Sequence, residues 1–313
     1  MKHHIKRAKH VYQERGLVDL ISTMVSYAPI ELNNATFRLR HGKGTHIMEE
    51  DWDTLVLLDA CRYDMFAEQI NFDGRLESRI SLGSTSEEFL ERNFTNKTFH
   101  DTVYINTNPY LPRLGLDDGT FHAVIDLLNR WDSERGTVHP QTVVEAAQRT
   151  QEEYPDKRLI IHFMQPHIPF IGPIGQQLLG EGWNTDNPDI HRRSIWSYLR
   201  EGEEEIEIDR VWEAYRENLD IVLSHVDSIL DTVPGKTIVS ADHGNLVGER
   251  LSPIPTKKKY GHPYGVYVPE LVKVPWFIIE SDERREIRSE PPVETNSQSE
   301  ETVDKRLEAL GYK

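Results

Sequence analysis

Two apolar runs, each followed by a carboxylate, place the strongest constraint on how this chain folds. The first is Thr54-Leu-Val-Leu-Leu58, which leads into Asp59. The second begins Thr237-Ile-Val239 and reaches Asp242-His243-Gly244. Apolar and β-branched residues without polar alternation are typical of strands that are covered on both faces. A carboxylate and an imidazole at a strand end suit a divalent cation, so we expect a buried sheet with metal-binding side chains at one edge.

Strands alternate with helices along the chain, which predicts an α/β fold with a mostly parallel central sheet and helices on both faces. Further strands are expected over Val103–Ile105, Arg158–Met164 and Val274–Ile279, and helices over Tyr63–Ile70, Ser86–Phe94, Gln141–Tyr154, Ile208–Thr232 and Val303–Leu310. In open α/β sheets the ligand site lies at the carboxyl ends of the strands. The candidate residues at or just beyond these ends are Asp59, His162, His167, Asp242 and His243.

Changes in composition suggest how the chain is divided. Its 313 residues are enough for one large α/β domain, which we expect over residues 51–280. Residues 1–50 are predicted to form a helical N-terminal extension, and the polar residues 174–205 a cap-like insert. A charged segment rich in Pro, Ser and Glu, residues 281–302, is predicted to be a flexible linker before a C-terminal helix in residues 303–313.

Composition and charge exclude several classes of function. A net charge of −16 argues against a nucleic-acid-binding surface, which needs clustered Lys and Arg. No apolar stretch approaches the ~20 residues of a membrane span, and the basic start of the chain lacks the apolar core of a secretory signal. The single cysteine, Cys61, excludes an intrachain disulfide and a cysteine-cluster metal site. We therefore predict a cytoplasmic protein without a membrane span, and the sequence does not indicate its oligomeric state.

Three consecutive hydroxyls follow Gly83 at the start of an expected helix: Ser84, Thr85 and Ser86. Unpaired backbone N–H groups and the positive end of the dipole make a helix N-terminus favourable for developing negative charge. A hydroxyl there can therefore act as a nucleophile. The alternative is an ordinary N-cap, with Glu87 or Glu88 completing a capping box.

Several motifs follow one another in an order that is found in one enzyme superfamily. They are Asp59, Thr85, the run His162-Phe-Met-Gln-Pro-His167-Ile-Pro169, Asp242-His243-Gly244, and His262 within Tyr260-Gly-His-Pro-Tyr264. This order resembles the alkaline phosphatase superfamily, on its sulfatase-like branch. The resemblance covers about residues 50–280 and the closing helix at Leu307-Glu-Ala-Leu-Gly-Tyr312, and leaves out residues 1–50 and 174–205.

Two departures from the sulfatase pattern bear on the chemistry that the resemblance implies. The chain lacks the Cys-x-Pro-x-Arg motif of true sulfatases, and it has Asp59-Ala60 where two adjacent aspartates are usual. Cys61 lies too close to Asp59 for the nucleophile position, so we interpret it as a buried structural thiol. Thr85, with Ser84 and Ser86 as alternatives, is then left as an unmodified hydroxyl nucleophile.

The resemblance also implies a cofactor. A ligand set of Asp59, Thr85, Asp242 and His243 is similar to the one-metal set of phosphoglycerol and phosphoethanolamine transferases. We expect one divalent cation: zinc, manganese, magnesium or calcium. His262 and His167 partly fill the second site of two-metal relatives, but the aspartate four positions before a histidine is missing, so a second ion would bind only weakly.

The remaining candidates have both a catalytic and a structural interpretation. His262 is a metal ligand or the acid for the leaving oxygen, and His162, His167 and Arg62 contact the substrate or protonate the leaving group. Alternatively, His162 is a satisfied core residue and Arg62 pairs with Asp64. The basic run Lys257-Lys-Lys259 either steers an anion or forms a solvated loop.

The sequence therefore leads to two functional hypotheses from different classes. The first is a metal-dependent hydrolase or transferase that acts on a phosphate or sulfate ester through a Thr or Ser nucleophile. The resemblance alone adds a glycan or cell-envelope precursor as its substrate. The second is a non-catalytic, sulfatase-like binding module. An enzyme requires Asp59, Asp242 and His243 to surround one ion with a hydroxyl within reach.

Overall fold

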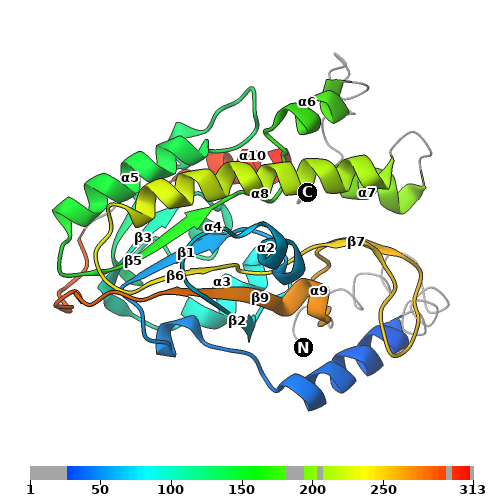
Figure 1. The fold of residues 1–313 in the computed structure, drawn as a ribbon, viewed down its shortest axis with the longest axis horizontal. Helices are drawn as coiled ribbons and strands as arrows, with labels where there is room; N and C mark the ends of the chain where they lie inside the picture. The colour runs from blue at the N-terminus through cyan, green and yellow to red at the C-terminus, as the bar shows by residue number, and fades with distance from the viewer. Residues whose placement is uncertain (1–26, 181–193, 203–206, 294–297, 311–313) are drawn as a thin grey trace.

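A seven-stranded sheet forms the centre of the protein in the computed structural model, which describes residues 27–180, 194–202, 207–293 and 298–310 (Figure 1). The strand order is β2-β9-β6-β1-β5-β3-β4. The strands are β1 (Thr54–Leu58), β2 (Arg75–Ile80), β3 (Phe99–Asn106), β4 (Phe121–Asp126), β5 (Arg158–Phe163), β6 (Thr237–Ser240) and β9 (Lys273–Ile279). β1, β3, β4, β5 and β6 are parallel, whereas β9 is antiparallel to both of its neighbours. The predicted mostly parallel sheet is confirmed.

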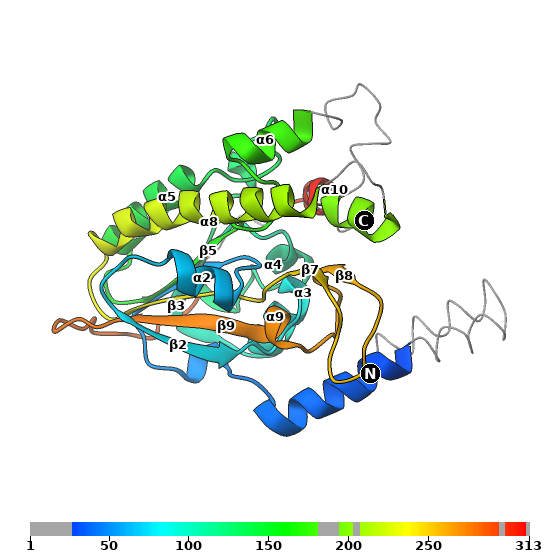
Figure 2. The same cartoon turned by 45° about the vertical axis from the view of Figure 1, so that its right-hand side comes forward.

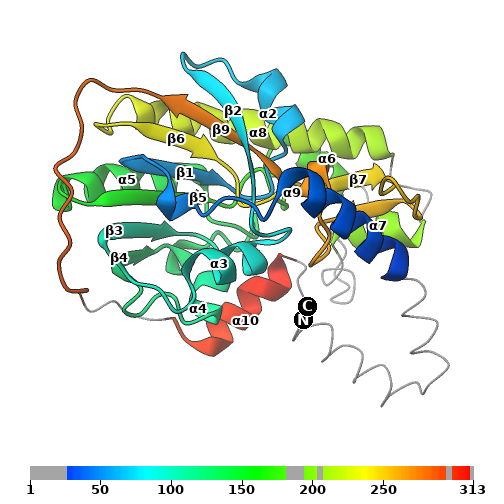
Figure 3. The same ribbon diagram turned by 90° about the horizontal axis from the view of Figure 1, so that it is seen from below.

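Helices cover both faces of this sheet. On one face α5 (Pro140–Glu153) and α8 (Ile208–Leu230) lie side by side, with α2 (Tyr63–Gln69) next to α8 (Figure 2). On the other face lie α3 (Ser86–Phe94) and α4 (Tyr110–Arg113), and α10 (Glu300–Ala309) packs against α4 (Figure 3). The described part of the chain contains no helix that is long and apolar enough to cross a membrane.

The side chains of β1 explain why helices must cover both faces of the sheet. These side chains alternate between the two faces, as a strand requires. Val56 and Leu58 pack into the core beneath α5 and α8, whereas Leu55 and Leu57 pack beneath α3. All four are fully buried. An unbroken apolar run is therefore what a central strand of this sheet needs.

Smaller elements lie beyond the carboxyl edge of the sheet. β7 (Leu246–Glu249) and β8 (Lys259–Gly261) form an antiparallel pair, and α7 (Ile195–Glu201) packs against β8. Residues 27–41 are helical, and Ile30 and Phe37 on this helix pack with Leu246 and Tyr267. The other short elements are η1 (Ile47–Glu49), η2 (Leu128–Arg130), α6 (Pro173–Gly180) and α9 (Pro269–Val272).

The expected elements agree with the structure where the apolar pattern is continuous, and β1 and α3 agree to the residue. The edge strands β2 and β4 were not expected. β2 reads Arg-Leu-Glu-Ser-Arg-Ile and is only half-buried, so its sequence lacks the apolar run of a central strand. Residues 1–26 of the predicted extension, and residues 181–193 and 203–206 of the predicted insert, lie outside the described residues.

Candidate metal centre and nucleophile

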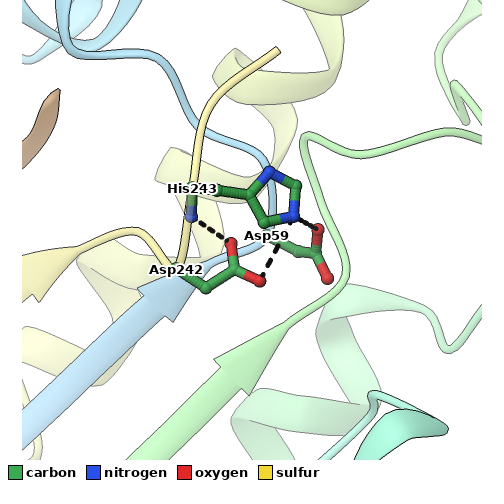
Figure 4. A group of neighbouring side chains, drawn as sticks. All are labelled: Asp59, Asp242 and His243. Atoms are coloured by element: carbon green, nitrogen blue, oxygen red, sulfur yellow. Dashed lines mark hydrogen bonds and ion pairs between the residues drawn. The ribbon is translucent and has the colours of Figure 1, made fainter. Parts of the chain in front are cut away.

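The two central strands β1 and β6 deliver three potential metal ligands to the carboxyl edge of the sheet. Asp59 follows β1, and Asp242 and His243 follow β6, which pairs directly with β1. All three side chains are fully buried. One ligand atom from each lies within 4.8 Å of the others, and the side chains converge in Figure 4. The three residues thus form a group of the size that one cation can bridge.

Hydrogen bonding within this group leaves one oxygen of each carboxylate for a cation. Asp59 Oδ2 accepts from Ser86 Oγ at 3.1 Å and from Asn108 Nδ2 at 2.8 Å. Asp242 Oδ1 accepts the backbone N–H groups of Ala60 and His243 at 3.0 and 2.7 Å. Among the described residues, Asp59 Oδ1 and Asp242 Oδ2 have no hydrogen-bond partner. Buried carboxylate oxygens without partners are unfavourable, so this donor set fits a divalent cation.

His243 is oriented to complete the set. Its Nδ1 lies 2.7 Å from the carbonyl oxygen of Gly244, so Nδ1 carries the proton and Nε2 carries a lone pair. Nε2 lies 3.7 Å from Asp59 Oδ1 and 3.6 Å from Asp242 Oδ2, the two oxygens without partners. Two carboxylate oxygens and one imidazole nitrogen therefore face a common point.

The electrostatics of the group also favour a cation. Burial and the charge of Asp242 raise the pKa of Asp59 well above its usual value. Burial also disfavours the charged form of Asp242, but the imidazoles of His243 and His162 outweigh it and lower the pKa of Asp242. Two ionised carboxylates in one buried site repel each other. A bound divalent cation would remove that repulsion.

The three predicted hydroxyls take different positions at the start of α3. Thr85 is the N-cap: its backbone is extended, and its Oγ1 accepts the N–H of Glu88 at 3.1 Å. Ser84 Oγ lies 3.0 Å from Glu88 Oε2 and accepts the N–H of Gly265 at 2.8 Å. Ser86 Oγ lies 3.1 Å from Asp59 Oδ2 and 3.3 Å from His243 Nε2. Ser86 is therefore the hydroxyl that contacts the metal-binding group.

Gly83 and Glu88 fix the turn that presents Ser86. A Cβ at position 83 would overlap the backbone nitrogen of Phe89, so the turn can pass over the start of α3 only as glycine. The buried carboxylate of Glu88 accepts the N–H of Ser84 at 2.9 Å and pairs with Arg92. Only half of the predicted capping box is present, because Thr85 Oγ1 accepts the N–H of Glu88, whereas the Glu88 carboxylate accepts the N–H of Ser84 instead of that of the N-cap Thr85. These bonds hold the backbone that aims Ser86 at the carboxylates.

His162, at the end of β5, lies at the same edge. Its Nε2 is 3.9 Å from Asp59 Oδ2 and 3.8 Å from Asp242 Oδ2, and has no hydrogen-bond partner among the described residues. A hydrogen bond of 2.8 Å to the hydroxyl of Tyr104 fixes the other ring nitrogen. Burial lowers the pKa of His162 to about 4, so the ring is neutral at pH 7. His162 borders the metal-binding group rather than lying in the apolar core.

His167 and His262 form a second layer of imidazoles next to His243. The ring centroids of His262 and His243 lie 4.7 Å apart, and those of His262 and His167 lie 5.0 Å apart. Nδ1 of His167 is 2.6 Å from the carbonyl of Ile168, and Nδ1 of His262 is 3.0 Å from Asn245 Oδ1. Burial lowers the pKa of His167 to about 4 and that of His262 well below its usual value. Both rings are therefore neutral at pH 7.

Arg62 forms the ion pair with Asp64 that was predicted as the alternative to a substrate contact. Its guanidinium pairs with Asp64 at 2.6 Å and with Glu249 at 2.5 Å, and it lies over the ring of Trp212. These contacts join α2 to β7 and α8. Cys61 is free and buried, and burial raises the pKa of its thiol, as expected for a structural cysteine.

Asn108 was not among the sequence candidates. It lies in the turn after β3 and donates to Asp59 Oδ2. The sequence Asn106-Thr-Asn-Pro109 has the composition of a turn, and a side-chain amide beyond a strand's carboxyl end is the one local signal that points to this edge. β3 pairs with β5 in the sheet, and this pairing brings Asn108 to Asp59. The pairing is set by the tertiary fold and not by the local sequence.

Comparison with known proteins gives matches at the level of structure. No family model and no curated protein matches the sequence. Similar solved structures include the zinc complex of the C-terminal periplasmic domain of EptC from Escherichia coli (14% identity, TM-score 0.47, 76% of each chain covered). They also include that domain of the phosphoethanolamine transferase EptC from Campylobacter jejuni (13%, 0.42, 73% of this chain and 78% of that chain). A third is a protein in the alkaline phosphatase superfamily from Vibrio parahaemolyticus (13%, 0.41, 90% and 74%), the superfamily that the motif order resembles.

Proposed function

We propose that this protein is a metal-dependent enzyme that acts on a phosphate or sulfate ester, with Ser86 as its nucleophile. One observation carries the proposal. The hydroxyl of the first residue of α3 contacts Asp59 Oδ2 at 3.1 Å and His243 Nε2 at 3.3 Å, beside two carboxylate oxygens without partners. A nucleophile within hydrogen-bond reach of a group that can take its proton is the arrangement that covalent catalysis requires.

The residues divide the chemistry among them. Asp59, Asp242 and His243 would hold one divalent cation, which when bound lowers the pKa of a hydroxyl near it and screens the charge of the ester. Ser86 donates its hydroxyl proton to Asp59 Oδ2 as Oγ forms its bond to phosphorus or sulfur and the bond to the leaving oxygen breaks. The N–H groups at the start of α3 favour the negative charge that develops there.

The neutral imidazoles define a further role. With their Nδ1 protons directed at the carbonyl oxygen of Ile168 and at Asn245 Oδ1, Nε2 of His167 and of His262 carries a lone pair. Such nitrogens accept protons or bind cations. We propose that His167 and His262 bind a proton or a weak second ion beside the reacting group, and that a protonated ring gives its proton to the leaving oxygen.

Two finer assignments rest on the sequence alone. The resemblance favours transfer or hydrolysis of a group on a glycan or cell-envelope precursor, and we propose a location inside the cell. The location stays a prediction, which cell fractionation followed by immunoblotting checks.

The test is turnover of matched aryl esters. The protein would be supplied separately with zinc, manganese, magnesium and calcium, and assayed on an aryl sulfate, an aryl phosphate monoester and an aryl phosphodiester. We expect turnover of at least one ester that depends on the metal and stops with a chelator. Turnover of none with any of these ions would contradict the proposal and favour the binding module.

Matched variants of the three hydroxyls identify the nucleophile. Ser86→Ala should lower kcat by at least about three orders of magnitude, because it removes the attacking atom. Thr85→Ala is the control: the loss of an N-cap costs about 1 kcal/mol of stability and should leave most of the turnover. Loss of turnover in Thr85→Ala or Ser84→Ala, with activity kept in Ser86→Ala, would move the role to that neighbour.

A further inference from the structure

A cavity of about 230 Å³ opens beside the nucleophile turn. Thr85 and His262 line it at the end near the candidate metal centre, and the aromatic side chains of Tyr110, Trp196 and Tyr264 line its walls. Arg200, on α7, also lines the cavity. Ligand sites commonly combine apolar and aromatic walls with a few polar groups that fix orientation. This cavity therefore has the composition of a subsite for the organic part of an ester.

α7 holds Arg200 in a defined position. Trp196, on the same helix, is buried and packs so closely on β8 that a Cβ at Gly261 would lie 3.3 Å from its side chain. Arg200 Nη2 donates to Ser197 Oγ at 2.7 Å. No carboxylate of the described residues pairs with the Arg200 guanidinium. The Arg200 guanidinium thus lines the cavity without an ion-pair partner among the described residues, and Glu87 is the one carboxylate residue in the same lining.

Two lysines add to this positive charge. They belong to the basic run that precedes His262, and Lys259 begins β8, on which α7 packs. Burial lowers the pKa of Lys259, and the positive charges of Arg200 and Lys257 lower it further. A group of cations without carboxylate partners among the described residues is unusual in a chain of net charge −16. Such a group attracts anions and suppresses binding of the wrong partners.

We propose that the cavity receives the organic part of the ester, and that Arg200, with Lys259 on the neighbouring strand β8, selects substrates that carry a second anionic group. This inference rests on the proposed function. Arg200 is exposed, whereas Asp59 and Asp242 are fully buried. The cations therefore lie at the opening, apart from the reacting group, where they contact the remote end of the substrate.

The test compares two substrates that differ only in the charge of the leaving group: 4-carboxyphenyl phosphate and 4-carbamoylphenyl phosphate, or the corresponding sulfates. The measured quantity is the ratio of their kcat/KM values. We expect Arg200→Gln to lower the ratio of carboxylate to amide by about fivefold to tenfold, the size of a partly exposed charge-assisted contact. Because the same two leaving groups are used for each variant, their different reactivities cancel.

The control is Arg210→Gln. Arg210 is an exposed arginine on α8 that pairs with Glu213 and lies outside the cavity, so the ratio should stay at the wild-type value. Lys259→Gln gives a second, independent reduction of the ratio if Arg200→Gln fails to fold.

Other results would overturn the inference. An unchanged ratio in both Arg200→Gln and Lys259→Gln would show that the cations do not contact the leaving group. An equal loss on both substrates would assign Arg200 to the reacting phosphate instead. In either case the wild-type turnover leaves the proposed function intact, whereas no turnover of either substrate by the wild type overturns both.

Discussion

β1 has a buried aspartate at each end, and the two carboxylates differ in their hydrogen-bond and ion-pair partners. Asp53, before the strand, is 1% exposed, and its Oδ2 accepts the N–H of Lys236 at 2.7 Å and Nε of Arg284 at 2.5 Å. Asp59, after the strand, is fully buried, and among the described residues it has no arginine or lysine partner and its Oδ1 has no hydrogen-bond partner. The described chain supplies a cation at the amino end of β1, whereas the proposed metal ion would supply the positive charge at the carboxyl end.

The segment after β9 extends this contrast. Residues 281–293 of the predicted linker run along the amino edge of the sheet, and its last residues, from Glu300, belong to α10 (Figure 3). Backbone N–H groups of Arg288, Glu290 and Val293 donate to carbonyls of residues 156, 100 and 122 at 2.8–3.0 Å. The amino edge is thus closed by hydrogen bonds and an ion pair, whereas the carboxyl edge leads to the cavity.

Asp242→Asn is expected to have the largest effect at the carboxyl edge. The amide keeps one oxygen for the N–H groups of Ala60 and His243 but replaces the unpartnered oxygen with a donor. Metal affinity should fall by more than about a hundredfold, and turnover with it. The melting temperature without metal should stay level or rise, because one of two repelling carboxylates is gone. A large fall in that temperature would mean that the charge is structural.

Asn108→Ala should have an intermediate effect. Its amide donates to Asp59 Oδ2, so its removal loosens the carboxylate without deleting a ligand. Metal affinity should fall by roughly tenfold to a hundredfold, as is usual for groups that orient a ligand. Equilibrium dialysis measures this change. An unchanged affinity would show that Ser86 alone orients Asp59.

Asp53→Ala should affect stability and leave turnover per folded molecule unchanged. Its partner Arg284 is 42% exposed, so water screens the pair and the free energy of unfolding should fall by about 2 kcal/mol. Asp51→Ala is the matched control, since Asp51 pairs with the same arginine but is 67% exposed, and should cost about 0.5 kcal/mol. Urea titration measures both. Equal losses would mean that burial of Asp53 adds nothing.

The sequence predicted which metal-binding side chains meet, but it left open which of the three hydroxyls contacts them. Strand ends are visible in an apolar run, so Asp59, Asp242 and His243 were predicted to converge. The choice among three hydroxyls depends on where the helix begins: Thr85 is the extended cap, and Ser86 is the first helical residue that faces Asp59. If α3 started one residue earlier or later along the chain, the positions of Thr85 and Ser86 relative to Asp59 would change.

Long-range partners were beyond sequence reasoning. Asp53 and Asp59 flank the same strand, and the one local feature that distinguishes them is that Asp59 lies at its carboxyl end. Their difference comes from Arg284, which lies 231 residues from Asp53 in the chain. The edge strand β4 was missed for a related reason, because its place beside β3 follows from tertiary packing.

The most direct test of the account is calorimetric titration of zinc, one of the four candidate divalent cations, into Asp59→Asn and Asp53→Asn. Both variants remove one buried charge from an end of β1, and circular dichroism verifies that both are folded. We predict that Asp53→Asn binds one equivalent of zinc with the affinity of the wild type, and that Asp59→Asn does not bind it. Equal zinc binding by the two variants would contradict the claim that the carboxyl edge of the sheet is built around a cation.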